Sequence, residues 1–212
     1  VPDDLVEIEA CFSPGVSTVS EFEKDCFKRG MKIFLADKSV DKPKIGLNKN
    51  NYHFLKKYIG CYNNDDYITL DSWVNSTKIK KNKDLMLQMD IEGAEYLSLV
   101  NISDDLIKLF RIIVIEFHDL HKFWNKGFYN IASVCFDKLL QHHTCVHIHP
   151  NNFEPINSHD GIEIPMAAEL TFIRNDRISK KTPQKSFPHK LDTDNSKEKE
   201  SIILPEIWYN NK

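Results

Sequence analysis

Two short apolar segments, residues 85–89 and 110–117, constrain the fold more than any other feature of this chain. The first reads Leu-Met-Leu-Gln-Met, which is too short for a typical helix, and the second contains an unbroken β-branched run at residues 112–115. Such runs are typical of strands buried on both faces of a parallel sheet. The residues between them have helical spacing, so the sequence predicts a strand–helix–strand unit with a right-handed crossover.

Ionisable residues stand at the ends of both segments. Asp90 and Glu92 follow the first, and Glu116 and His118 end the second. In open α/β sheets, ligands bind beyond the carboxyl ends of the strands, so we expect the functional site at this edge. Glu116 and His118 are two residues apart and should share one face of their strand. An imidazole there can accept a proton near neutral pH, and a purely structural pair is the alternative.

The N-terminal part repeats this pattern. Residues 5–12 read as a strand, Gly15 follows where the backbone turns tightly or approaches a ligand, and helical spacing then runs to Gly30. Residues 31–37 are a second expected strand, which ends in Asp37. This order is the opening of a Rossmann-like unit, in which such an acid can accept both ribose hydroxyls of a nucleotide. Asp37 would suit NAD equally well.

The rest of the chain completes a mostly parallel, seven-stranded α/β sheet. Residues 38–51 are polar and barely long enough for a crossover, so we expect a short helix or none. Further strands are expected at residues 53–60, 144–149 and 167–173, and helices at 68–74 and 129–142, with the last hairpin supplying an antiparallel strand. Residues 175–201 are polar and read as a mobile tail or flap, whose apolar end at 202–209 packs back on the body.

The composition indicates one globular domain and limits its partners. The 212 residues are 41% hydrophobic and 28% charged with a net charge of −3, which gives no nucleic-acid footprint. No apolar run approaches the roughly 20 residues of a membrane span. The five cysteines include no C-x-x-C pair and are typical of free thiols in the cytoplasm. The sequence leaves the oligomeric state open.

Two groups of side chains raise the question of a metal. Asp90, Glu92 and His118 together would suit Mg²⁺ or another hard ion. Three potential zinc ligands are expected on one face of a later strand: Cys145, His147 and His149. Alternate positions of a single strand are poorly placed to converge on one ion. We therefore assign no metal from the sequence.

Several motifs together carry a resemblance to a known family. They are Ser13-Pro-Gly-Val-Ser-x-x-x-x-Phe22-Glu23, Asp37, Asp90-Ile-Glu-Gly-Ala-Glu95, Ile115-Glu-Phe-His118, His147-x-His-x-Asn-Asn152, Glu169-Leu-Thr-Phe-Ile-Arg174 and Phe187-Pro-His-Lys-Leu-Asp192. This set resembles the FkbM-type methyltransferases, which have the Rossmann-like class I fold with helices on both faces of the sheet. The acid-x-Gly-x-Gly-x-Gly loop of class I enzymes aligns with Glu9-x-Cys11-x-Ser13-x-Gly15, which keeps one glycine.

The resemblance implies a methyltransferase domain at residues 1–174, followed by a tail at 175–212. S-adenosyl-L-methionine would be the cofactor, and the acceptor a hydroxyl on a sugar, glycan precursor or secondary metabolite. The implied cofactor-binding residues are Glu9, Ser13, Gly15, Asp37 and Asp90. The implied catalytic group is His118 as the base, oriented by Glu116 or Asp90. Two alternatives stay open: an NAD(P)-dependent oxidoreductase and, given the single loop glycine, a non-catalytic nucleotide-binding module.

Overall fold

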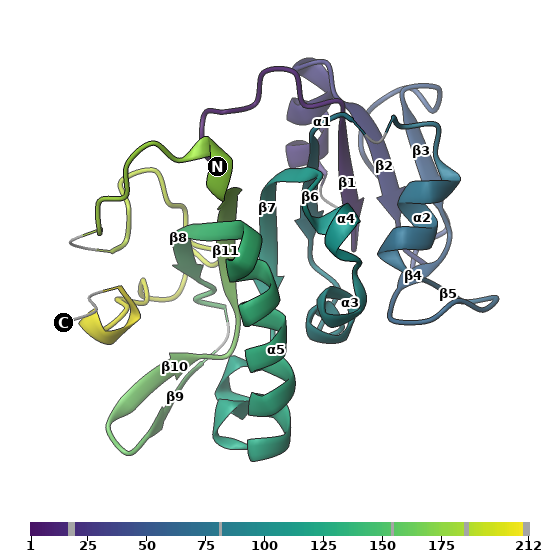
Figure 1. Ribbon diagram of the computed structural model, residues 1–212. Helices are drawn as coiled ribbons and strands as arrows, with labels where there is room; N and C mark the ends of the chain where they lie inside the picture. The colour runs from purple at the N-terminus through teal and green to yellow at the C-terminus, as the bar shows by residue number, and fades with distance from the viewer. Residues whose placement is uncertain (17–19, 81, 154, 185–186, 210–212) are drawn as a thin grey trace.

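A seven-stranded sheet forms the centre of the computed structural model, which describes residues 1–16, 20–80, 82–153, 155–184 and 187–209. Its strand order is β3-β2-β1-β6-β7-β11-β8 (Figure 1). The strands are β1 (Ala10–Pro14), β2 (Lys32–Ala36), β3 (Tyr52–Leu55), β6 (Leu85–Met89), β7 (Phe110–Phe117), β8 (His143–Pro150) and β11 (Ala168–Arg174). The first five are parallel, and β11 is antiparallel to both of its neighbours, β7 and β8. The expected seven-stranded, mostly parallel sheet is confirmed.

The helices are unevenly divided between the two faces of the sheet. They are α1 (Glu21–Lys28), α2 (Leu70–Ser76), α3 (Glu95–Asn101), α4 (Asp104–Ile107) and α5 (Lys126–His142), with 3₁₀ turns η1 (Leu120–Trp124), η2 (Asn175–Arg177) and η3 (Glu206–Trp208). Helices α2 to α5 cover one face, whereas α1 packs on the other (Figure 1). Two small sheets lie outside the main one: β4 (Tyr58–Ile59) with β5 (Tyr67–Ile68), and β9 (Ile156–His159) with β10 (Ile162–Pro165).

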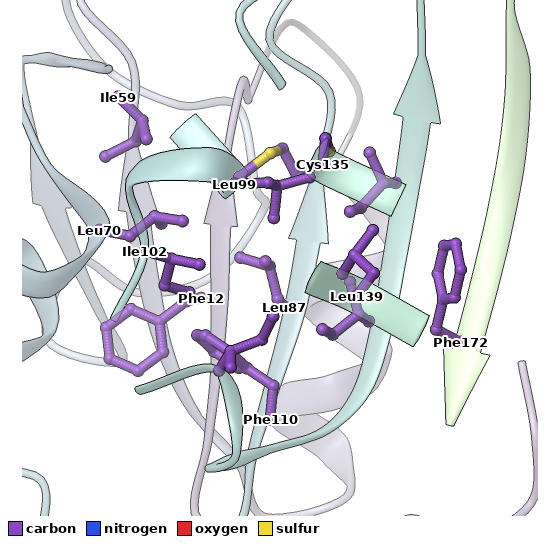
Figure 2. Packing of buried hydrophobic residues seen from close by; sticks show 14 of the residues in the cluster. Phe12, Ile59, Leu70, Leu87, Leu99, Ile102, Phe110, Cys135, Leu139 and Phe172 are labelled. Atoms are coloured by element: carbon purple, nitrogen blue, oxygen red, sulfur yellow. The ribbon is translucent and has the colours of Figure 1, made fainter. Parts of the chain in front are cut away.

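The strands are buried on both faces, as their apolar runs predict. Figure 2 shows Phe12, Leu87 and Phe172 of the sheet in one packed cluster with Leu99 of α3 and Leu139 of α5. Alternate residues of the same strands face the second cluster, which includes α1. Full burial of each large apolar side chain stabilises the fold by roughly 1.5–3 kcal/mol.

The first strand begins later than the sequence pattern predicts. The expected strand covered residues 5–12, whereas β1 starts at Ala10 and continues through Pro14. The preceding segment cannot extend straight because Glu7 has a left-handed backbone with φ 66°. Pro14 is tolerated because it ends the strand, where its missing N–H is not needed, and its carbonyl accepts the Asp90 N–H at 3.2 Å. Glu9 therefore lies at the amino end of the sheet.

Three other differences come from tertiary pairing. The strand expected at residues 53–60 is divided between β3 and β4, which belong to different sheets. Residues 38–51 contain no helix, as expected, and the β9–β10 hairpin was not predicted. A bulge in β8 pairs Thr171 with His147 but Phe172 with Cys145. It turns Cys145 toward the helix-rich face, so the expectation that Cys145 shares a face with His147 is wrong.

Residues 187–200, here called the C-terminal cover, lie against the end of β8. Asn152, which is 2% exposed, accepts the Ser196 N–H at 2.8 Å and donates to the Ser196 carbonyl at 2.8 Å. The ring of His147 lies 2.8 Å from Oδ1 of Asp192. Farther along, the Trp208 indole N–H donates to the carbonyl of Glu163 on β10 at 3.3 Å. The apolar end thus packs on the body.

Candidate functional site

Four of the residues singled out in the sequence follow neighbouring parallel strands at the same edge of the sheet. Gly15 follows β1, Asp37 follows β2, Asp90 follows β6 and His118 follows β7. Because parallel strands end on the same side, these residues share one edge, where α/β proteins bind ligands. Residues 17–19, which lie within the first motif, are outside the described residues.

Gly15 brings the ends of β1 and β6 into close contact. Its backbone is left-handed with φ 85°, and a Cβ here would lie 1.5 Å from the Asp90 carbonyl oxygen. Its N–H donates to the carbonyl of Ala36 at 3.0 Å. Only glycine can adopt this conformation at this distance. The glycine therefore fixes the loop after β1 against Asp90, which places that loop at the centre of the edge.

Asp37 is buried with one carboxylate oxygen in use. Its Oδ1 accepts the backbone N–H and the hydroxyl of Ser39, both at 2.7 Å. No hydrogen-bond donor on Oδ2 is found among the described residues, and the whole residue is 8% exposed. The carboxylate is thus oriented by its own loop and keeps one acceptor oxygen for a ligand.

Glu95 organises the loop between β6 and α3. The residue has no exposed surface, and its Oε1 accepts the N–H groups of Ile91 and Gly93 at 3.1 Å each. The same oxygen lies 3.1 Å from Nδ1 of His118. Because the loop residue Glu92 has φ 56° and Gly93 has φ 98°, the two N–H groups can point back to this carboxylate. Glu95 therefore joins the loop to the end of β7.

His118 is held on two sides. Glu95 contacts Nδ1, and the hydroxyl of Tyr96 donates to the His118 carbonyl at 2.7 Å. Its Nε2 lies 3.8 Å from Oδ1 of Asp90. Burial alone would lower the pKa of His118, but the hydrogen bond and charge of Glu95 and the other carboxylates outweigh it and raise that pKa to about 9. The ring is therefore mostly an imidazolium at neutral pH.

Asp90 is the carboxyl group that titrates near neutrality. Burial raises its pKa most, the charge of Glu116 adds to this, and His118 offsets it only in part, which gives a pKa of about 7. Its Oδ1 is buried and has no hydrogen-bond partner among the described residues. An oxygen of this kind can accept a proton or a hydrogen bond from a ligand.

The side chain of Ser13 is engaged in hydrogen bonds within the protein. Its hydroxyl is 2.5 Å from Oε1 of Glu23 on α1 and 2.6 Å from Oε1 of Gln88 on β6. Burial raises the pKa of Glu23, and the Ser13 hydroxyl opposes this only in part. The serine thus joins β1, α1 and β6 just below the edge.

Glu116 and Glu9 do not lie where the sequence-based interpretation needs them. Glu116 accepts the side-chain amide of Asn151 at 2.7 Å, whereas Glu95 makes the contact that orients His118. Glu9 is paired with Lys32 at 2.5 Å at the opposite, amino end of the sheet. The spacing of Glu95 after Asp90 also fits a simple helix cap, so the sequence could not reveal that its side chain points back to β7.

The site also contains a group with metal-ligand spacing. The ligand atoms of Asp90, Glu95 and His118 all lie within 4.8 Å of one another. Glu92, which the sequence grouped with Asp90 and His118, has an 85% exposed side chain and lies 3.6 Å from the His118 ring. The described geometry thus replaces Glu92 by Glu95 in this cluster.

The sheet order, the helices and the polar carboxyl edge are consistent with a methyltransferase-like α/β fold. A family model, Methyltransferase FkbM domain, matches residues 41–154, which is more than half of the chain. The chain belongs to the FkbM methyltransferase family. The match includes Asp90, Glu95 and His118, and Gly15 and Asp37 lie before it. A search of curated proteins finds no match.

The described part of the chain has no helix that combines the length and the apolar character needed to cross a membrane.

Proposed function

We propose that this protein is an S-adenosylmethionine-dependent methyltransferase with a Rossmann-like class I fold, and that it methylates a hydroxyl group. Family membership supports methyl transfer. The arrangement of Gly15, Asp37 and Asp90 at the ends of three adjacent strands supports the cofactor, and it is the observation that carries the proposal. The acceptor class of sugars, glycan precursors or secondary metabolites rests on the family resemblance.

The residues present fit the cofactor. Asp37 offers its Oδ2 to a ribose hydroxyl while Ser39 holds its other oxygen. Gly15 holds the loop after β1 close to Asp90, where the methionine part would lie between β1 and β6. When bound, S-adenosylmethionine supplies an electrophilic methyl group whose departure leaves a neutral thioether. The protein mainly has to align the acceptor oxygen with that group and exclude water.

Asp90 is better suited than His118 to take the acceptor's proton. A general base must be unprotonated at working pH, and it works best with a pKa near that pH. Asp90 has a pKa of about 7 and an unpartnered Oδ1, whereas the pKa of His118 is about 9. In this proposal Asp90 accepts the proton, and the imidazolium of His118 stabilises the carboxylate. We therefore propose Asp90 rather than His118 as the base.

Calorimetry tests the cofactor assignment. S-adenosylhomocysteine should bind with micromolar affinity, and Asp37→Ala should weaken binding at least tenfold, or about 1.4 kcal/mol. Asp25→Ala is the matched control, because Asp25 is an exposed carboxylate of α1 that pairs with Lys28 at 2.7 Å. If NAD binds and S-adenosylhomocysteine does not, the protein is an oxidoreductase or a nucleotide-binding module instead.

A further inference from the structure

Four ionisable side chains form one row across four neighbouring strands, here called the ionisable row. Glu116 on β7 is paired in register with Glu169 on β11, and Glu169 is paired with His149 on β8. Asp90 lies one residue beyond the last paired residues of β6 and β7, which are Met89 and Ile115. Paired residues point to the same face of a sheet. The row therefore leads from the proposed methyl-transfer position toward the far end of the sheet.

The row has an excess of negative charge. Glu116 and Glu169 are directly opposite each other, and like charges in such cross-strand pairs destabilise a sheet. Burial raises the pKa of Glu169, and the charge of Glu116 raises it further. The groups that offset these charges are imidazoles, His118 for Asp90 and His149 for Glu169. The Asn151 amide is a neutral donor to Glu116.

His149 lacks a partner although it is buried. The residue is 7% exposed, and neither ring nitrogen has a hydrogen-bond partner among the residues that the structure describes. Its Nδ1 lies 3.6 Å from Oδ2 of Asp192, beyond hydrogen-bond distance. Leaving a buried polar group unpaired costs roughly 1–3 kcal/mol. A fold that leaves the His149 ring unpaired despite this cost indicates that a ligand supplies the missing hydrogen-bond partner.

The C-terminal cover closes over this row without neutralising it. Asp192 contacts His147, and Asn195 forms a hydrogen bond with Glu169. The lysines of the cover are exposed, and Lys199 donates to the carbonyl of Phe153 and lies 4.8 Å from that ring. The cover thus adds an acid and an amide to the row, and the excess of negative charge remains.

We propose that the ionisable row is the acceptor-binding site and that the acceptor is a hydroxylated compound carrying a protonated amine. Glu116 and Glu169 would hold the ammonium group, and His149 would hydrogen-bond a neighbouring hydroxyl. The methylated hydroxyl would then lie beside Asp90, at the same end of the row as the cofactor. This inference rests on the proposed methyltransferase function.

The charge of the acceptor should change the pKa of Glu169. An ammonium beside the two carboxylates favours the ionised form of Glu169, so binding should lower this pKa, which burial and the charge of Glu116 raise. The groups that face Glu169 are Glu116 on β7, His149 on β8, and Asp192 and Asn195 of the cover. A neutral polyol would not compensate the two charges and should leave this pKa raised.

Calorimetry on the complex with S-adenosylhomocysteine tests the inference with three probes: glucosamine, glucose and N-acetylglucosamine. Glucosamine should bind at least about tenfold more tightly than either neutral sugar. Equal affinity for the three sugars, or no glucosamine binding at millimolar concentration, would overturn the inference.

A substitution in the ionisable row tests whether these side chains cause the preference for glucosamine. Glu169→Gln should bring the affinities for glucosamine and glucose within about threefold of each other, while the affinity for S-adenosylhomocysteine stays unchanged. Glu163→Gln, at an exposed position of β10, is the matched control and should keep the preference. If Glu169→Gln fails to fold, the comparison of the three sugars with the wild-type protein still decides. Failure of S-adenosylhomocysteine to bind would instead count against the proposed function.

Discussion

The titration of Asp90 and His118 is a direct test of the site's electrostatics, because it needs no acceptor. Carbon-detected NMR can follow the carboxyl group of Asp90 and the ring of His118 in the folded protein. We expect Asp90 to titrate at about pH 7 rather than at its ordinary 3.8, and His118 at about 9 rather than 6.5. Values near 4 for Asp90 and near 6.5 for His118 would refute the reasoning.

Two substitutions separate the causes. The imidazolium of His118 lies 3.8 Å from Asp90, and at that distance a unit charge contributes about 1 kcal/mol in water-like surroundings. Because both side chains are partly exposed, we take this screened value, which is about 0.8 of a pKa unit. His118→Gln should therefore raise the pKa of Asp90 by at least about that amount. Glu95→Gln should lower the pKa of His118, since it removes the main charge that raises it.

The same values predict the pH dependence of turnover once an acceptor is known. With Asp90 as the base, the rate should rise about tenfold between pH 6 and 8 and then level off. With His118 as the base, the rise should continue through pH 9, at a further factor of about ten between pH 8 and 10. Asp90→Asn should lower turnover by roughly 10²–10⁴. A profile that levels off only above pH 9 would restore His118 as the base.

Two further predictions concern structure. Gly15→Ala should lower the free energy of unfolding by more than about 3 kcal/mol, because the new Cβ overlaps the Asp90 backbone. Gly30→Ala, with a left-handed backbone but no neighbour within 4 Å, should cost only about 1–2 kcal/mol in the same denaturant titration. Trypsin should cleave first within residues 180–199. Asn152→Ala should accelerate cleavage in the C-terminal cover, while Asn75→Ala at an exposed position of α2 should not. Equal rates would mean that Asn152 does not hold the cover.

Sequence reasoning predicted the elements whose signals are local. The run at residues 85–89 is β6 with the same bounds, and the helix expected at residues 68–74 is α2, Leu70–Ser76. The carboxyl edge followed from the rule that parallel strands end together. These predictions succeeded because strand length, apolar pattern and turn residues all indicate the same structure.

The sequence-based assignments that failed have a common physical cause. Each depends on contacts between residues that are distant in the sequence. The position of Glu95 at the start of a helix also fits a simple helix cap, but the fold places its oxygen on both the loop and His118. The bulge that reverses Cys145 appears only when β8 is paired with β11. Glu9 was implied as a cofactor residue by the aligned loop motif, whereas the structure pairs it with Lys32 at the amino end of the sheet. Local pattern does not contain the register of a sheet, so such assignments need the three-dimensional pairing.

The ionised carboxyl edge is costly to the fold, and this cost supports a functional role. The pKa of Asp90 is raised in the folded state, so the folded protein binds more protons than the unfolded chain between about pH 3.8 and 7 and loses stability as pH rises through that window. His118 also has a raised pKa, so its contribution is complete below 6.5 and is lost as pH rises through about 9. Near neutral pH, where a carboxylate base is needed, ionised Asp90 therefore destabilises the fold, whereas the imidazolium of His118 still stabilises it. A sheet shaped by stability alone would end in neutral or paired residues, and the retained charge indicates a ligand that compensates it.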